Sequence, residues 1–82
     1  MKPSKILYLD LKNLLLKLGF FSETITGNHQ LFQHPSGALI VLPSYQDKDY
    51  VYLIHLAAIH HILKKYSERA FLLSMAKARG TL

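Results

Sequence analysis

The chain has 82 residues, half of them apolar, which suits one small domain with a single hydrophobic core and excludes a disordered chain. Ten Lys and Arg against five Asp and Glu give a formal net charge of +5, which attracts polyanions such as RNA. Cysteine is absent, so a disulfide framework and a thiolate metal site are excluded. We expect a cytoplasmic protein with neither a signal peptide nor a membrane span.

The first predicted element is a helix that begins near Pro3, with Ser4 as its N-cap. Leucines at helical spacing form an apolar stripe: Leu7, Leu11, Leu14, Leu15 and Leu18. Gly19 is expected to end this helix. The stripe should face the core, which leaves Lys5 and Lys12 on a solvated face where they could bind RNA phosphates.

Three short strands are predicted next, over residues 20–24, 29–34 and 38–42. The turns between them lie at 26–28, where Gly and Asn tolerate positive φ, and at 35–37. Pro43 ends the third strand because proline cannot donate to the ladder. Together these segments predict a three-stranded antiparallel sheet.

His29 lies where the first of these turns ends and a strand begins, a position that holds a side chain firmly near solvent. Gly27 and Asn28 would shape the turn beside it. An imidazole can take or give a proton near neutral pH, as RNA cleavage requires, although on local chemistry alone an isolated histidine in a strand is more often structural. Strand alternation places His34 on the opposite face, which argues against a mechanism with two histidines.

Residues 44–50 are predicted to form a polar loop in which Lys48, a further candidate for phosphate binding, stands between Asp47 and Asp49. Asp49 is the expected N-cap of a second helix over residues 51–66. That helix is apolar on two sides and should therefore be buried on two sides.

The second helix carries three histidines, His55, His60 and His61, but no pair has the i, i+4 spacing of a helical zinc site. We therefore expect no metal. Ser67 is predicted to cap a third helix over residues 68–78 that ends at Gly80.

Four motifs follow one another along the chain: Lys17-Leu18-Gly19-Phe20, Gly27-Asn28-His29, Phe32-Gln33-His34-Pro35-Ser36-Gly37 and Ile40-Val41-Leu42-Pro43. Their order and spacing, over about residues 8–65, resemble those of the HicA (YcfA-like) family of bacterial mRNA interferase toxins. The resemblance implies an α-β-β-β-α fold like that of double-stranded-RNA-binding domains. It also implies a catalytic role for His29, no cofactor, and a HicB-type antitoxin as partner.

The chain departs from the family pattern at two places beside the predicted site. Residues 23–26 are Glu-Thr-Ile-Thr, where family members usually carry basic residues. Gln30 stands where a second histidine often follows the first.

We therefore expect one α/β (α+β) domain over residues 1–82, with a core at about 4–66 and a C-terminal helical extension at 67–82. The preferred function is an mRNA endoribonuclease toxin with His29 as its catalytic residue, and Lys5, Lys12 and Lys48 as RNA-binding residues. The alternative is a non-catalytic RNA-binding or protein-interaction module on the same fold. Residues 51–66 and 67–79 could also form a homodimer contact.

Overall fold

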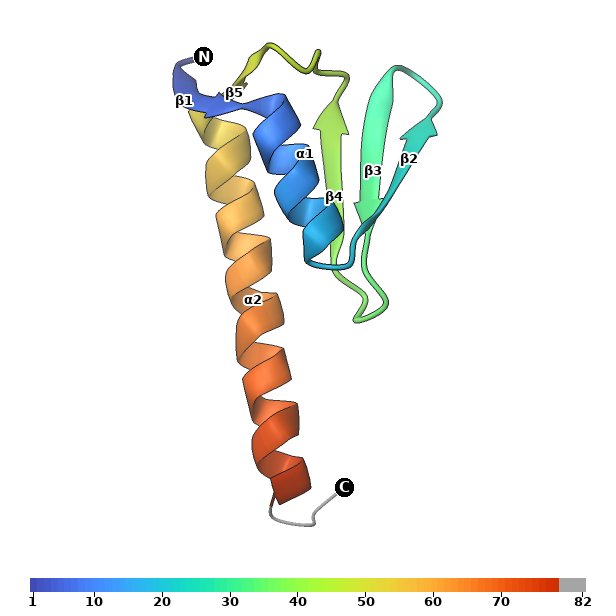
Figure 1. Cartoon of the computed structure of the whole chain (residues 1–82), viewed down its shortest axis with the longest axis vertical. Coiled ribbons are helices and arrows are strands. Elements are labelled where there is room, and N and C mark those ends of the chain that lie inside the picture. Colours follow the sequence, from blue (N-terminus) through green and yellow to red (C-terminus); the bar gives the residue numbers. More distant parts are fainter. Residues whose placement is uncertain (79–82) are drawn as a thin grey trace.

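The computed structural model describes the backbone of residues 1–78 and the side chains of residues 1–67. Two helices, a three-stranded sheet and a separate pair of short strands make up the fold (Figure 1). In chain order the elements are β1 (Pro3–Leu7), α1 (Tyr8–Lys17), β2 (Phe21–Ile25), β3 (His29–Gln33), β4 (Leu39–Pro43), β5 (Tyr50–Tyr52) and α2 (Leu53–Ala78). The predicted α+β class is confirmed.

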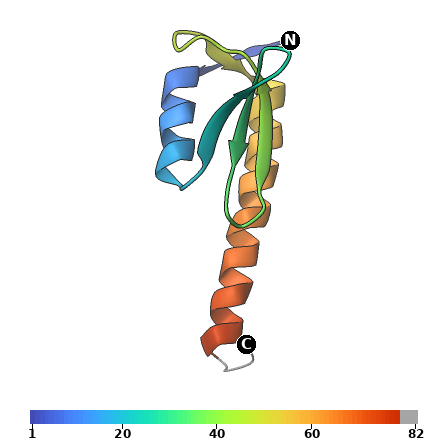
Figure 2. The ribbon, with the colours of Figure 1, turned by 90° about the vertical axis from the view of Figure 1, so that its right-hand side faces the viewer.

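The three-stranded antiparallel sheet is also confirmed, with strand order β2-β3-β4. Each strand lies within one residue of its predicted range, and Pro43 is the last residue of β4 and the ladder partner of His29. Gly27 and Asn28 have φ of 87° and 59°, which agrees with the turn chemistry expected of them. Figure 2 shows that this turn lies at the same end of the molecule as the β1–β5 pair.

The predicted start of the first helix at Pro3 and Ser4 is wrong, because residues Pro3–Leu7 form β1 and pair with β5. The Ser4 hydroxyl accepts a local hydrogen bond from the Ile6 amide (3.1 Å) instead of capping a helix. Helix α1 begins at Tyr8 without a side-chain cap. Backbone carbonyls of the 44–49 loop satisfy its first N–H groups instead.

Two amides at the start of α1 donate to that loop, Tyr8 N to Asp49 O (2.8 Å) and Leu9 N to Asp47 O (3.2 Å). The end of α1 follows the prediction. Gly19 has φ of 99° and donates to Leu16 O, while the next amide donates to Leu15 O, the hydrogen-bond pattern of a Schellman motif.

The second helix also begins later than expected. Asp49 does not cap it, because β5 intervenes and the Asp49 carboxylate accepts a hydrogen bond from the Gln46 amide. Helix α2 starts at Leu53, whose amide donates to Lys2 O (2.9 Å). The predicted break at Ser67 is wrong, since α2 continues to Ala78.

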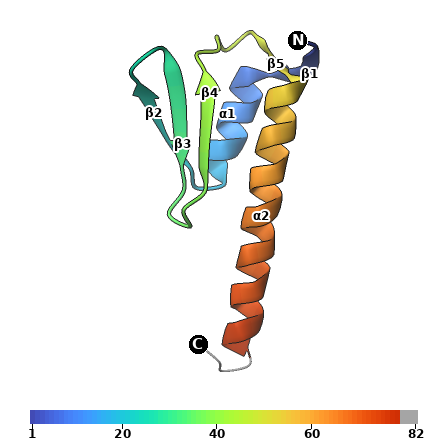
Figure 3. The same cartoon turned by 180° about the vertical axis from the view of Figure 1, so that it is seen from behind.

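The C-terminal extension is therefore the second half of α2, which projects beyond the end of the sheet (Figure 3). The predicted helix end at Gly80 and the last residues of the 67–82 extension lie outside the described residues. Within residues 1–78, no helix is long and apolar enough to cross a membrane.

The hydrophobic core joins both helices to one face of the sheet. Its buried members are Tyr8, Leu11, Leu15, Phe20, Phe32, Ile40, Leu42, Val51 and Ile59. The Phe32 side chain is fully buried, and its ladder partner Ile40 is also in the core. This inner face of β3 is therefore fixed by packing, and the opposite face of the sheet is left to solvent.

We predict that Phe32→Ala lowers the free energy of unfolding by about 3–5 kcal/mol, because it removes a fully buried ring and leaves a cavity. Phe21→Ala is the matched control, since Phe21 lies on the outer face of the same sheet and is 65 % exposed. Urea unfolding followed by circular dichroism measures both. Equal losses in the two variants would contradict the assigned faces.

Candidate functional site

His29 is the first residue of β3 and is held between two strands, with Ile25 and Pro43 as its ladder partners. The preceding residue, Asn28, accepts a hydrogen bond through its carbonyl from the Ser44 amide (2.9 Å). A Cβ atom placed on Gly27 would lie 3.5 Å from His29 Nδ1, so the imidazole rests against this glycine. The side chain is exposed, and a rigid ladder thus presents an imidazole to solvent.

The surface around His29 is more apolar than charged. Its outer sheet face includes Phe21, Leu39 and Val41, each at least half exposed. Among the residues of β2, β3 and β4 that point to this face, Glu23 is the one with a charged side chain. The three strands therefore do not surround the imidazole with charged residues.

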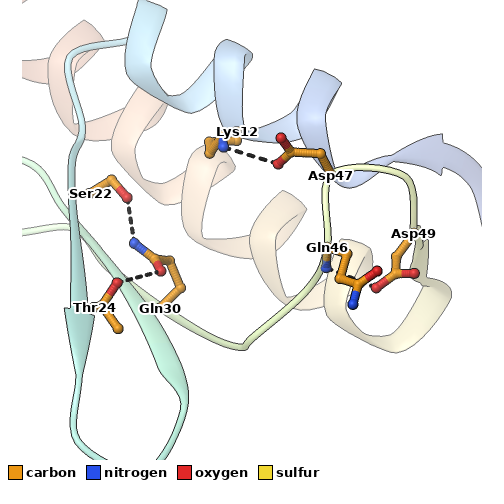
Figure 4. A network of polar contacts seen from close by, with 7 residues as sticks. All are labelled: Lys12, Ser22, Thr24, Gln30, Gln46, Asp47 and Asp49. Atoms are coloured by element: carbon orange, nitrogen blue, oxygen red, sulfur yellow. Dashed lines mark hydrogen bonds and ion pairs between the residues drawn. The ribbon is translucent and has the colours of Figure 1, made fainter.

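The three predicted RNA-binding lysines lie outside the sheet that carries His29. Lys5 is in β1, Lys12 is in α1, and Lys48 is in the loop that follows β4. Lys12 Nζ pairs with Asp47 Oδ1 at 3.1 Å (Figure 4). The same Nζ lies over the ring of Tyr8. None of the three belongs to a strand of that sheet, and Lys12 is paired with a carboxylate.

Gln30, which the resemblance to HicA toxins would align with a second histidine, faces the other side of the sheet from His29. Its side-chain amide donates to Ser22 Oγ (2.6 Å), and its Oε1 accepts from the Thr24 hydroxyl (3.1 Å), as Figure 4 shows. Because neighbouring residues of a strand point to opposite faces, Gln30 cannot reach a phosphate held at His29.

His34 lies at the opposite end of the hairpin, where hydrogen bonds and contacts with aromatic rings hold its imidazole in place. Its Nδ1 accepts from the Ser36 amide (3.0 Å), which leaves the proton on Nε2, 3.2 Å from Leu18 O. Its ring centroid is 5.0 Å from that of Phe20 and 4.6 Å from that of Tyr66. His34 thus joins the β3–β4 turn to the end of α1 and to α2, away from the face of His29.

A groove that the sequence did not predict lies beside the hairpin that carries His29. It has a volume of about 590 Å³ and is lined by Met1, Pro3, Pro43, Ser44, Tyr45, Asp49, Tyr50 and Tyr52. Two of these residues connect it with the His29 hairpin, because Pro43 is the ladder partner of His29 and Ser44 bonds to Asn28. The close spacing of Tyr45, Tyr50 and Tyr52 in the sequence was the available signal. The hydrogen bond from the Tyr52 amide to the Tyr45 hydroxyl brings Tyr45 to the strand that holds the other two.

Within this groove, Tyr45 is held in place by hydrogen bonds and by ring stacking. Its hydroxyl accepts from the Tyr52 amide (3.0 Å) and is also hydrogen-bonded to Nδ1 of His55. Its ring stacks on Tyr8, with 5.3 Å between centroids. Burial raises the pKa of Tyr45, the nearby charge of Asp49 adds to this rise, and the bond from Tyr52 partly opposes it. The hydroxyl is therefore a neutral structural link.

In the part of the chain that the structure describes, this site has no set of side chains that could bind a metal ion. No three His, Cys, Asp or Glu side chains there lie close enough together to hold an ion. The arrangement that remains is an exposed imidazole beside a tyrosine-lined groove, which suits proton transfer next to a ring-shaped ligand.

We predict that the two hairpin histidines differ in their effect on stability. His34→Ala should lower the free energy of unfolding by about 1–3 kcal/mol, because it removes two hydrogen bonds and the ring contacts with Phe20 and Tyr66. His29→Ala should change it by at most about 0.5 kcal/mol, as is usual for an exposed side chain. Urea titrations of both variants test this, and a larger loss for His29→Ala would contradict it.

We also predict a loss of stability in alkali that depends on Tyr45. Because the pKa of Tyr45 in the folded state is raised above 10.0, the folded chain keeps the hydroxyl proton at a pH where the unfolded chain has released it. The stabilisation is complete below about pH 10 and is lost as the pH rises through the folded-state pKa. Unfolding free energies at pH 9 to 11 should fall less steeply for Tyr45→Phe than for the unmodified chain, and identical slopes would contradict the assignment.

No family model matches this chain, and neither a curated protein nor a solved structure matches it. The likeness to HicA toxins thus rests on the four sequence motifs.

Proposed function

We propose that this chain is the toxin of a type II toxin–antitoxin system, a cytoplasmic mRNA endoribonuclease that uses a single histidine and is neutralised by a HicB-type antitoxin. The observation that carries the proposal is the exposed imidazole of His29, presented by a hairpin whose neighbours Pro43 and Ser44 line a tyrosine-bearing groove. The order of the HicA-like motifs supports it. The net charge of +5 favours an RNA ligand.

The proposed fold relationship is to double-stranded-RNA-binding-like domains. The elements α1, β2, β3, β4 and α2 follow one another in the expected α-β-β-β-α order, and β2-β3-β4 form the expected sheet. In this proposal the β1–β5 pair and the projecting half of α2 are additions to that domain.

The proposed reaction is attack of a ribose 2′-oxygen on the neighbouring phosphorus. His29 takes the 2′-hydroxyl proton as general base while the new P–O2′ bond forms. The P–O5′ bond breaks, and the 5′-oxygen receives a proton from solvent or from the imidazolium. The products are a 2′,3′-cyclic phosphate and a 5′-hydroxyl, so atoms and protons balance.

A second candidate, a non-catalytic protein-interaction module, is favoured by a separate observation. An apolar groove of about 340 Å³ lies between the two helices, lined by Ile6, Leu11, Leu14, Leu56, Ile59, His60 and Leu63. A partner helix fits such a surface. The proposed antitoxin contact and a homodimer through residues 51–66 and 67–79 would both use α2.

We predict that inducible expression of the chain arrests growth and that the purified protein cleaves RNA. His29→Ala should lower the cleavage rate about 10²- to 10⁴-fold, the usual worth of a general acid or base. His61→Ala is the control, because His61 is an exposed histidine on α2, outside the hairpin. Equal cleavage or toxicity for the unmodified chain and His29→Ala would rule out the proposed catalyst and favour the interaction module.

A further inference from the structure

The groove beside His29 offers a flat aromatic surface to a ligand. Tyr50 contributes the most exposed ring among its tyrosines, at 53 % exposure, whereas Tyr45 and Tyr52 are half-buried. Tyr50 is also held in place, since it pairs with Leu7 across the β1–β5 ladder. Bases of single-stranded RNA stack on such rings, because every base has a π-face.

One carboxylate lies in the same groove. Asp49 is fixed by three hydrogen bonds: its Oδ2 accepts from Gln46 N (2.8 Å), its amide donates to Gln46 O (3.0 Å), and its carbonyl accepts from Tyr8 N (2.8 Å). The other loop carboxylate, Asp47, is paired with Lys12. An ionised carboxylate has about four acceptor positions, so the exposed side chain of Asp49 keeps capacity for donors from a ligand.

This inference rests on the proposed nuclease function. We propose that the groove is a base-binding subsite that takes a guanine of single-stranded RNA next to the scissile phosphate, with the base stacked on Tyr50 and its Watson–Crick edge bound to Asp49.

The choice of guanine follows from donor and acceptor patterns. Guanine presents two adjacent donors, N1–H and N2–H, which one carboxylate can accept together. Adenine and cytosine place a ring-nitrogen acceptor beside their amino group, and uracil has one donor between two carbonyls. Each of these three would turn an acceptor toward the carboxylate of Asp49, which has no proton to donate.

The position of the groove favours a nucleotide over a peptide. Tyrosine-lined grooves also bind proline-rich peptides. Here the groove adjoins His29 through Pro43 and Ser44, and the chain carries a net charge of +5. A base in the groove would leave its phosphate near the imidazole. Base pairing would hide the guanine edge, so double-stranded RNA is not the ligand.

The test is binding of 5′-GMP, 5′-AMP, 5′-CMP and 5′-UMP to the full chain, measured by nuclear magnetic resonance titration. We expect GMP to bind at least about 10-fold more tightly than the others. Tyr50→Leu should weaken GMP binding about 10-fold and Tyr50→Phe should preserve it, because stacking needs the ring. Asp49→Asn keeps an acceptor for Gln46 N and should remove the preference for GMP, while Asp10→Asn, on α1, serves as the control.

Mononucleotide binding does not require cleavage, so the two proposals can fail separately. GMP binding that depends on Tyr50 and Asp49 supports the subsite even if no RNA is cut. His29-dependent cleavage without guanine preference, and unchanged by Tyr50→Leu, overturns the subsite and leaves the nuclease standing. Equal binding of all four nucleotides, or Tyr50-dependent binding of a proline-rich peptide in place of GMP, also overturns it. Far-UV circular dichroism of each variant confirms that it is folded.

Discussion

The alternation of side chains along β3 is the constraint on which the rest of the structure depends. Phe32 is fully buried against the helices, and His29, an odd number of residues away, must then lie on the opposite, solvent-facing side. A slip of the strand by one residue would expose the phenylalanine and turn the imidazole toward the core. The position of the candidate catalytic residue is thus set by the hydrophobic effect at another residue.

The register of this strand is held at both ends. At one end the left-handed conformations of Gly27 and Asn28 close the β2–β3 turn. At the other end His34 connects the β3–β4 turn to the end of α1 and to Tyr66 of α2. The two hairpin histidines therefore have different surroundings, although they are close in sequence: His34 is half-buried among rings and hydrogen bonds, and His29 is exposed.

The 44–49 loop has two roles that the fold combines. Its carbonyls cap the start of α1, which has no side-chain cap, and its side chains form part of the groove beside His29. Tyr45 links this loop to β5 and to His55 of α2. The groove is thus built from two short strands and from a loop that backbone and side-chain hydrogen bonds hold in place.

What the sequence by itself determined was local. The glycine end of α1, the positive φ at the β2–β3 turn, the alternation of β3 and the exposure of His29 all depend on neighbouring residues, and each could be predicted from them. Tertiary structure alone decided the start of α1, the β1–β5 pair and the tyrosine groove. These depend on hydrogen bonds between residues far apart in the chain, such as Tyr8 to Asp49 and Leu53 to Lys2, which local propensity does not contain.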